Sequence, residues 1–246
     1  MFNVATEPAP VAPAVAASDK CLFVFSRTTS RLFFLFPDKP SSNASLVADQ
    51  LLSNKFAILI TELLDETLTE KKNRYNFSID EIKSIGIQLI ESIEYIHSNK
   101  YLYIDLKPDN IMFDNKNNLK LVDFNACSKY LNCQSEFYEN ILLKNPIGNF
   151  IYSSININKS YSGIRIDDIE SVLWIMLYLL DKDIITDINN QKSLNKLIDI
   201  KEKYILNYLL GRDKFIFNFI EELKTYDSIN NKKPNYRKFI TILQND

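Results

Sequence analysis

Four polar residues have the side-chain chemistries that phosphoryl transfer requires. Asp105, Lys107 and Asn110 stand in the segment YIDLKPDN, and Asp123 follows behind the strand-like run LKLV. Such a transfer needs a group that orients the attacking hydroxyl, a cation beside the phosphate, and oxygen ligands for Mg²⁺. Asp105 and Lys107 suit the first two roles, and Asn110 and Asp123 suit the third. The alternative is a polar loop in which Asp and Asn only form turns.

A helix is predicted shortly before this segment. Ser78 and Glu81 delimit the sequence SIDE, in which each side chain can cap the backbone N–H of the other residue, so a helix should begin there. Apolar residues then recur at helical spacing through about His97 and give one buried face: Ile82, Ile85, Leu89, Ile93 and Ile96. Upstream, FAILITELL from Phe56 predicts a buried strand that runs into a connector.

The sequences NIMFD and LKLVDF predict two short strands joined by a turn at NKNN. Such a hairpin would return Asp123 to the side of Asn110, where two oxygen ligands could hold Mg²⁺. Val172–Leu180 is apolar on all sides, as expected of a helix at the centre of a helical body. Two or three further helices fit between Ser193 and Leu243. These elements predict a mainly helical α+β fold that contains one strand pair.

The first 57 residues differ in composition from the rest of the chain. Eight of the ten alanines precede residue 49, whereas no isoleucine occurs before Ile58. Residues 4–17 are rich in Ala and Pro and predict a flexible or polyproline-like tail, while CLFVFS and RLFFLF predict a hairpin across Arg27–Ser30. A divergent N-terminal extension explains this change, and so does a fusion, a truncation or an altered reading frame near residue 50.

Several motifs, taken in order, resemble those of one enzyme family. YIDLKPDN and VDFN resemble the catalytic loop and the magnesium motif of eukaryotic-type protein kinases, and IEYIHS precedes them at the family's distance. YSSIN, RIDDIES and KKPNYRKFITIL are similar to motifs of the casein kinase I group, which includes the vaccinia-related kinases. The resemblance runs from about Phe56 to the C-terminus. It implies a protein-kinase-like fold with a mainly helical C-lobe, a catalytic-loop β-hairpin and a reduced or atypical N-lobe.

The resemblance implies a role for each matching residue of the polar set. Asp105 would orient the substrate hydroxyl, and Lys107 would neutralise the γ-phosphate of ATP. Asn110 and Asp123 would hold Mg²⁺. These residues are the predicted catalytic and metal-binding set, with ATP and Mg²⁺ as cofactors.

Supporting roles follow from the same resemblance. Glu62 and Leu64 would belong to the hinge that meets adenine through backbone groups, with Thr61 as the gatekeeper. Asp168 would tie the central helix to the catalytic-loop backbone. His97, the single histidine of the chain, would be a packing residue and not a ligand or a base.

Two departures from the family pattern lie at the start of the catalytic loop. Tyr103 replaces a histidine and should still pack against Phe124. Ile104 replaces an arginine that pairs with a phosphorylated activation loop in the family. Because that guanidinium is missing, we expect that phosphorylation of the activation loop is not a switch in this chain.

Two further departures are asparagines. Asn125 replaces a glycine, and because Asn tolerates positive φ better than other side chains, the turn should survive. Asn149 replaces a threonine that braces Asp105 and Lys107 in the family. Its amide could still form a hydrogen bond to them.

The N-terminal side lacks two features that kinases use to hold the triphosphate. No glycine occurs before Gly86, so a Gly-rich loop is missing. Lys20, Lys39 and Lys55 are the lysines that precede the hinge, and none stands in a strand of the VAIK type. The chain therefore keeps the magnesium half of the site and lacks the half that clamps the triphosphate.

Three regions are predicted: a disordered Ala/Pro-rich tail at 1–19, atypical or residual N-lobe strands at 20–60, and a kinase-like hinge and helical C-lobe at 61–246. A net charge of −2 gives no general attraction to nucleic acid or to an anionic membrane. The longest apolar run is too short to span a bilayer. Three separated cysteines favour reduced thiols and an intracellular location, cytoplasmic or nuclear.

Three functions fit these observations. The first is a serine/threonine protein kinase that transfers the γ-phosphate of Mg-ATP to a protein hydroxyl, with weak or impaired turnover. The second is an inactive pseudokinase that serves as a binding or scaffold module. The third is a truncated kinase fragment. Besides ATP, the predicted partner is a protein, either substrate or binding partner, and the oligomeric state is left open.

Overall fold

The computed structural model describes residues 63–131, 136–180, 182–191, 193–208, 213–226 and 231–245, together with the backbone of two strands near the N-terminus. Several predictions lie outside these residues. They are the tail at 1–19, most of the strand that begins at Phe56, the gatekeeper Thr61 and the hinge residue Glu62.

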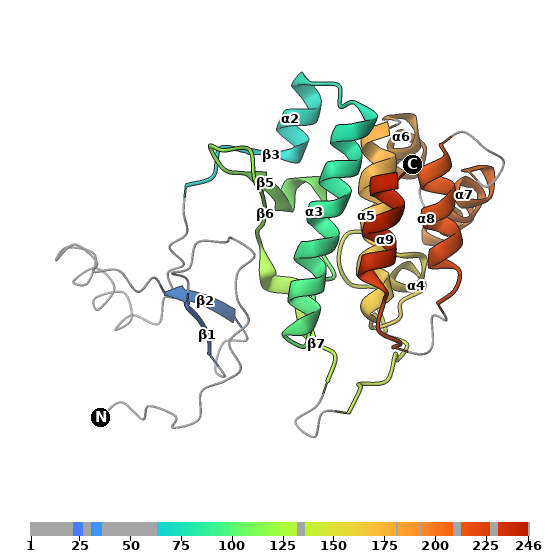
Figure 1. The fold of residues 1–246 in the computed structure, drawn as a ribbon. Coiled ribbons are helices and arrows are strands. Elements are labelled where there is room, and N and C mark those ends of the chain that lie inside the picture. The colour runs from blue at the N-terminus through green and yellow to red at the C-terminus, as the bar shows by residue number, and fades with distance from the viewer. Residues whose placement is uncertain are drawn as a thin grey trace, which may run out of the picture.

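The two N-terminal strands are β1 (Leu22–Ser26) and β2 (Arg31–Leu35). They pair in antiparallel register, with Val24 opposite Phe33, and are drawn in blue in Figure 1. The hairpin predicted from CLFVFS and RLFFLF is therefore confirmed.

Two further small sheets lie in the C-terminal body. Strands β3 (Glu66–Thr67), β5 (Ile111–Phe113) and β6 (Leu119–Leu121) form an antiparallel sheet in the order β3-β5-β6, and β4 (Tyr101–Leu102) pairs with β7 (Ser128–Lys129). The β5–β6 pair is the hairpin predicted from NIMFD and LKLVDF. The other pairings have no sequence signal, because strands of two residues are too short to show a period.

Helices make up most of the described body. Their bounds are α2 (Leu68–Arg74), α3 (Ile79–Ser98), α4 (Ile155–Asn158), α5 (Arg165–Leu180), α6 (Lys182–Asn189), α7 (Leu194–Tyr208), α8 (Lys214–Leu223) and α9 (Tyr236–Asn245), with short 3₁₀ turns η1 (Pro108–Asn110) and η2 (Phe124–Ala126). The predicted capping box starts α3: Glu81 N donates to Ser78 Oγ at 3.3 Å, and Ser78 N donates to Glu81 Oε2 at 2.8 Å. Within the described residues, no helix is both long and apolar enough to cross a membrane.

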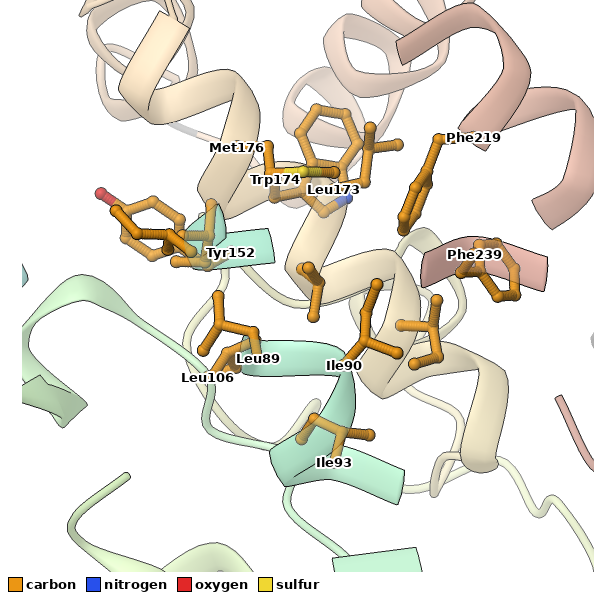
Figure 2. Packing of buried hydrophobic residues seen from close by; sticks show 14 of the residues in the cluster. Leu89, Ile90, Ile93, Leu106, Tyr152, Leu173, Trp174, Met176, Phe219 and Phe239 are labelled. Carbon is orange, nitrogen blue, oxygen red and sulfur yellow. The ribbon is translucent and has the colours of Figure 1, made fainter. Parts of the chain in front are cut away.

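The core is organised around α5, as its apolar sequence predicts. Figure 1 shows α3, α5 and α9 side by side, and α3 contacts both α5 and α9 in the core. Every residue of Val172–Leu177 is buried. Figure 2 shows the side chains that meet there: Leu89, Ile90 and Ile93 of α3, Leu173, Trp174 and Met176 of α5, Phe219 of α8 and Phe239 of α9.

A glycine on α3 permits this close packing. A Cβ atom at Gly86 would lie 2.7 Å from Met176 Sδ and 2.9 Å from Leu243 Cδ1. Both distances are shorter than a normal contact, so a side chain at this position would force the side chains of Met176 and Leu243 to move.

Candidate active site

Asp105 lies at the centre of a hydrogen-bonded cluster on the loop between β4 and η1. Lys107 Nζ donates to Asp105 Oδ2 at 2.8 Å, and Asn110 Nδ2 donates to the same oxygen at 3.1 Å and to the Asp105 carbonyl at 3.0 Å. The side chains of Asp105 and Lys107 are 15% and 25% exposed, whereas Asn110 is buried. The loop therefore brings three of the four predicted residues together, and two of them reach solvent.

The charges around Lys107 keep it protonated. The pKa of Lys107 is raised above its ordinary value, mainly because the ammonium donates a hydrogen bond to Asp105. The negative charges of Asp105, Asp123 and Asp109 raise the pKa further, and partial burial lowers it. The site thus holds a permanent cation among carboxylates, which is the electrostatic arrangement that an incoming phosphate group and its metal ion would meet.

Asp123 follows the second strand of the hairpin. Val122 N donates to the carbonyl of Asn110 at 3.0 Å, which extends the strand pairing to the base of the hairpin. The backbone of Asn110 therefore lies beside the residue that precedes Asp123. Asp123 itself is exposed, and its position leaves the carboxylate accessible to a ligand from solvent.

The turn after Asp123 differs from the expectation for Asn125. Asp123 takes the left-handed conformation, with φ 56, whereas Asn125 lies in η2 without a positive φ. Asn125 Nδ2 and N donate to Asp123 Oδ1 at 2.7 and 3.3 Å. The turn is present, but it does not use the tolerance of Asn125 for positive φ, because Asp123, two residues earlier, takes the positive φ and the amide folds back on it.

Asn149 does not take over the bracing role of the threonine that it replaces. Its Oδ1 accepts from the backbone N–H groups of Ile151 and Tyr152 at 2.9 and 3.3 Å. Within the described residues, no hydrogen bond joins the amide to the catalytic loop. The side chain therefore shapes its own turn instead of the site.

Tyr103 packs against Phe124, as expected. The two rings meet edge to face with centroids 5.4 Å apart, and the Tyr103 hydroxyl donates to the carbonyl of Val122. Burial raises the pKa of Tyr103 well above its ordinary value, so the phenol stays neutral and can donate. This side chain connects the start of the catalytic loop to the segment that carries Asp123.

Asp168 holds the catalytic-loop backbone, and the role implied by the resemblance is confirmed. Its Oδ2 accepts from Tyr103 N and its Oδ1 accepts from Ile104 N, both at 2.8 Å, and Asp168 is 2% exposed. Ile104 has φ 70, a conformation that costs a β-branched residue about 1–3 kcal/mol. The two hydrogen bonds from this buried carboxylate hold the loop in that strained conformation.

His97 is a packing residue, also as expected. Nε2 lies 2.8 Å from Asp168 Oδ2, Nδ1 lies 2.7 Å from the Tyr236 hydroxyl, and the residue is 2% exposed. Both ring nitrogens thus have partners inside the protein. The histidine joins the end of α3 to α5 and α9 beneath the loop.

The donors at the site suit Mg²⁺ in type. A carboxylate from Asp123 and an amide oxygen from Asn110 are hard oxygen ligands. In the part of the chain that the structure describes, no group of three or more His, Cys, Asp and Glu residues could hold a metal ion. A Mg²⁺ ion here would complete its shell with phosphate oxygens and water, as this ion commonly does. Leu64 is partly buried near the start of the described residues, and its contact with adenine stays a prediction.

Sequence reasoning missed a second group of buried polar residues. Asp167 and Glu170 on α5 and Lys201 on α7 all bond to residues between 150 and 158. The motif RIDDIES contains the two acidic residues, but only Asp168 has a role in the sequence interpretation. Lys201 stands among several lysines of one helix, and no spacing distinguishes it from the exposed ones.

Comparison with known proteins settles the family. The model of the protein kinase domain matches residues 42–241. This chain belongs to the protein kinase family. The match begins at residue 42, whereas the motif resemblance described above begins at about Phe56. It accounts for the mainly helical α+β architecture as a protein-kinase-like fold with a reduced N-lobe.

Two relatives are similar over most of the chain. Both are probable casein kinase I homologs of Encephalitozoon cuniculi (strain GB-M1). One is 27% identical over 195 residues, which cover 75% of this chain and 60% of the relative. The other is 26% identical over 196 residues, which cover 75% of this chain and 63% of the relative. The chain thus spans less than two thirds of the length of either relative.

Proposed function

We propose that this chain is a serine/threonine protein kinase of the casein kinase I group, which transfers the γ-phosphate of ATP to a protein hydroxyl with weak or impaired turnover. The observation that carries the proposal is the cluster in which Lys107 and Asn110 both donate to Asp105 Oδ2. A carboxylate, a cation and an amide meet at one point, and these are the groups that such a transfer uses.

Asp105 would orient the acceptor hydroxyl. Both hydrogen bonds to its carboxylate fall on Oδ2, and none from the described residues reaches Oδ1. Oδ1 can therefore accept a hydrogen bond from an incoming hydroxyl, while Oδ2 fixes the plane of the carboxylate before substrate arrives. Lys107, held 2.8 Å from Oδ2, would face the γ-phosphate and neutralise its charge.

Asn110 and Asp123 would hold Mg²⁺ beside the phosphates. When bound, the ion offsets the negative charge of the phosphate oxygens. The amide nitrogen of Asn110 is occupied by Asp105, which leaves the amide oxygen for the ligand role. Asp123 is exposed and can add its carboxylate.

The N-terminal side of the chain is the reason for proposing weak or impaired turnover. Glu62 and Leu64 would contact adenine at the hinge, but a Gly-rich loop over the phosphates is missing, since no glycine precedes Gly86. Losing that loop and its partner lysine could remove on the order of 4–6 kcal/mol of transition-state stabilisation. The same feature favours an alternative function, a pseudokinase that binds or scaffolds other proteins. Either function accords with an intracellular location, where ATP is available.

Thermal unfolding with and without Mg-ATP tests the nucleotide site. At about one hundred times Kd, binding should stabilise the chain by about 2.7 kcal/mol. For a chain of this size, Tm should rise by about 5–10 °C. The rise should require Mg²⁺ and disappear in Asp123→Asn. Asp109→Asn, an exposed neighbour on η1, is the matched control and should keep it.

Phosphorylation of a generic acidic protein substrate separates the two functions. Slow transfer that is lost in Asp105→Ala supports the kinase, and a Tm rise without any transfer supports the pseudokinase. A rate typical of kinases, about 1–100 s⁻¹, would contradict the impaired turnover. The lack of any Tm rise would contradict the nucleotide site itself.

A further inference from the structure

Residues 148–158, called here the SIN segment, run from Gly148 to the end of α4 and border the catalytic loop. Gly148 has φ 71, and a Cβ atom there would lie 3.1 Å from the carbonyl oxygen of Ile104. Ile104 is the residue before Asp105. The segment therefore touches the loop one residue from the proposed site, and any protein that presents a hydroxyl to Asp105 must pass close to it.

Lys201 of α7 is completely buried beneath the SIN segment. Its Nζ donates to the carbonyls of Phe150 and Ser153 at 3.0 and 2.5 Å, and to Asn158 Oδ1 at 2.8 Å. Three acceptors need three N–H donors, which an ammonium group has and a neutral amine does not. The geometry of the pocket therefore calls for the charged lysine.

Two groups on α5 compensate this buried charge. The face of the Trp174 ring lies 4.7 Å from Nζ, within cation–π range. The carboxylate of Glu170 acts on Lys201 through its charge, and it accepts from Ile155 N at 2.8 Å and from Trp174 Nε1 at 3.1 Å. Burial lowers the pKa of Lys201, and the charge of Glu170 raises it.

An apolar residue could fill the same volume but not the same role. It would leave the Ser153 carbonyl and the Asn158 amide oxygen buried without donors and the Phe150 carbonyl with Asn158 Nδ2 as its remaining donor, which the segment could relieve only by moving toward water. Lys201 holds the carbonyl of Phe150 inward, whereas the residue as a whole is 47% exposed. The hydrogen bonds of the buried Phe150 carbonyl thus fix the position of the exposed Phe150 side chain.

We propose that Lys201 is a positioning residue, which fixes the SIN segment against the catalytic loop and so shapes the surface that receives the protein substrate. It acts through the carbonyls of Phe150 and Ser153 and does not touch substrate itself. The statement about substrate rests on the proposed kinase function. The statement about the segment does not, so the two can fail separately.

Amide hydrogen exchange of the full chain tests the positioning itself. Lys201→Met should speed exchange in the SIN segment by about tenfold or more and leave the central part of α3 unchanged. Lys203→Met, an exposed lysine on the same helix, is the matched control. Lys201→Arg, which keeps the charge, should restore part of the protection. If Lys201→Met does not fold, Lys201→Gln, which keeps two N–H donors, serves in its place. Unchanged exchange in the segment, or an equal increase everywhere, would overturn the proposal.

Steady-state kinetics test the consequence for substrate. In Lys201→Met, KM for a protein substrate should rise about tenfold, while KM for ATP should stay the same, because Asp168 and not Lys201 holds the Asp105 loop. An equal loss for both substrates, or no change, would overturn the link to substrate. If the native chain transfers no phosphate, the kinase function fails, and the exchange result alone decides whether Lys201 fixes the segment.

Discussion

Two neighbouring aspartates of α5 hold two different loops, and they hold them in different ways. Asp168 accepts from two backbone N–H groups of the catalytic loop. Asp167 accepts from two side chains of the SIN segment, Ser154 Oγ at 2.7 Å and Asn156 Nδ2 at 2.8 Å, and from the backbone N–H of Ile164 at 2.7 Å. Both aspartates are buried, so the central helix of the core positions both loops.

This difference explains which residues of each loop can be replaced by other residue types. Every residue except proline supplies a backbone N–H, so a loop held by its backbone tolerates new side chains. The catalytic loop accordingly accommodates Tyr103 and Ile104 at positions where the sequence resemblance implies a histidine and an arginine. Asp167, by contrast, binds the SIN segment through side chains, so this contact depends on the donors of Ser154 and Asn156.

The largest effect should follow from removing the backbone anchor. Asp168→Ala would leave the N–H groups of Tyr103 and Ile104 and the ring of His97 buried without their acceptor. We expect a loss of about 3–5 kcal/mol in the free energy of unfolding. Urea denaturation measures it, with Asp199→Ala, an exposed aspartate on α7, as the control. A loss of unfolding free energy no larger than that of the control would show that the catalytic loop keeps its conformation without Asp168.

The side-chain anchor should give the protein a pH dependence. Burial raises the pKa of Asp167 from 3.8 to about 7. Between these values the folded chain binds a proton that the unfolded chain has released, so stability falls as pH rises from about 4 to 7. Asp167 can contribute up to about 4 kcal/mol of this fall, and burial of Glu170 adds to it in the same direction.

Denaturation curves across this pH range measure the slope. Asp167→Asn should have a smaller fall in stability between pH 4 and 7 than the native chain, whatever its stability at any single pH. Asp199→Asn is the exposed control and should keep the native slope. Parallel curves for the native chain and Asp167→Asn would show that the carboxylate titrates normally in the fold.

The smallest effect concerns α3, whose last turn brings His97 to Asp168. Ser78→Ala removes the N-cap acceptor for Glu81 N and should cost about 1 kcal/mol. Ser84→Ala, at an exposed position inside the same helix, should cost less or nothing. Thermal unfolding of the two variants gives the comparison, and equal Tm values would show that the capping box does not stabilise the chain.

Local patterns predicted the parts of the site that are close in sequence. The sequence SIDE starts α3, the apolar spacing buries its face, and the NKNN turn pairs β5 with β6, because each depends on neighbours along the chain. The positive φ at Ile104 could not be predicted, since a β-branched residue avoids it unless distant groups enforce it. The positive φ expected at Asn125 was misplaced for a related reason: the side-chain contact with Asp123 decides the turn.

The sequence alone determined the family, the order of the chemical groups and the helical body, since motif spacing and periodicity are properties of the chain itself. Only the tertiary structure decided that Lys201 is buried while Lys203 on the same helix is exposed, and that Asp167 and Asp168 serve different loops. The physical reason is that burial and hydrogen-bond partners depend on how helices pack. α5 and α7 meet the SIN segment only after the chain has folded. The ammonium group of Lys201 then donates to three residues that lie 43 to 51 positions earlier in the sequence.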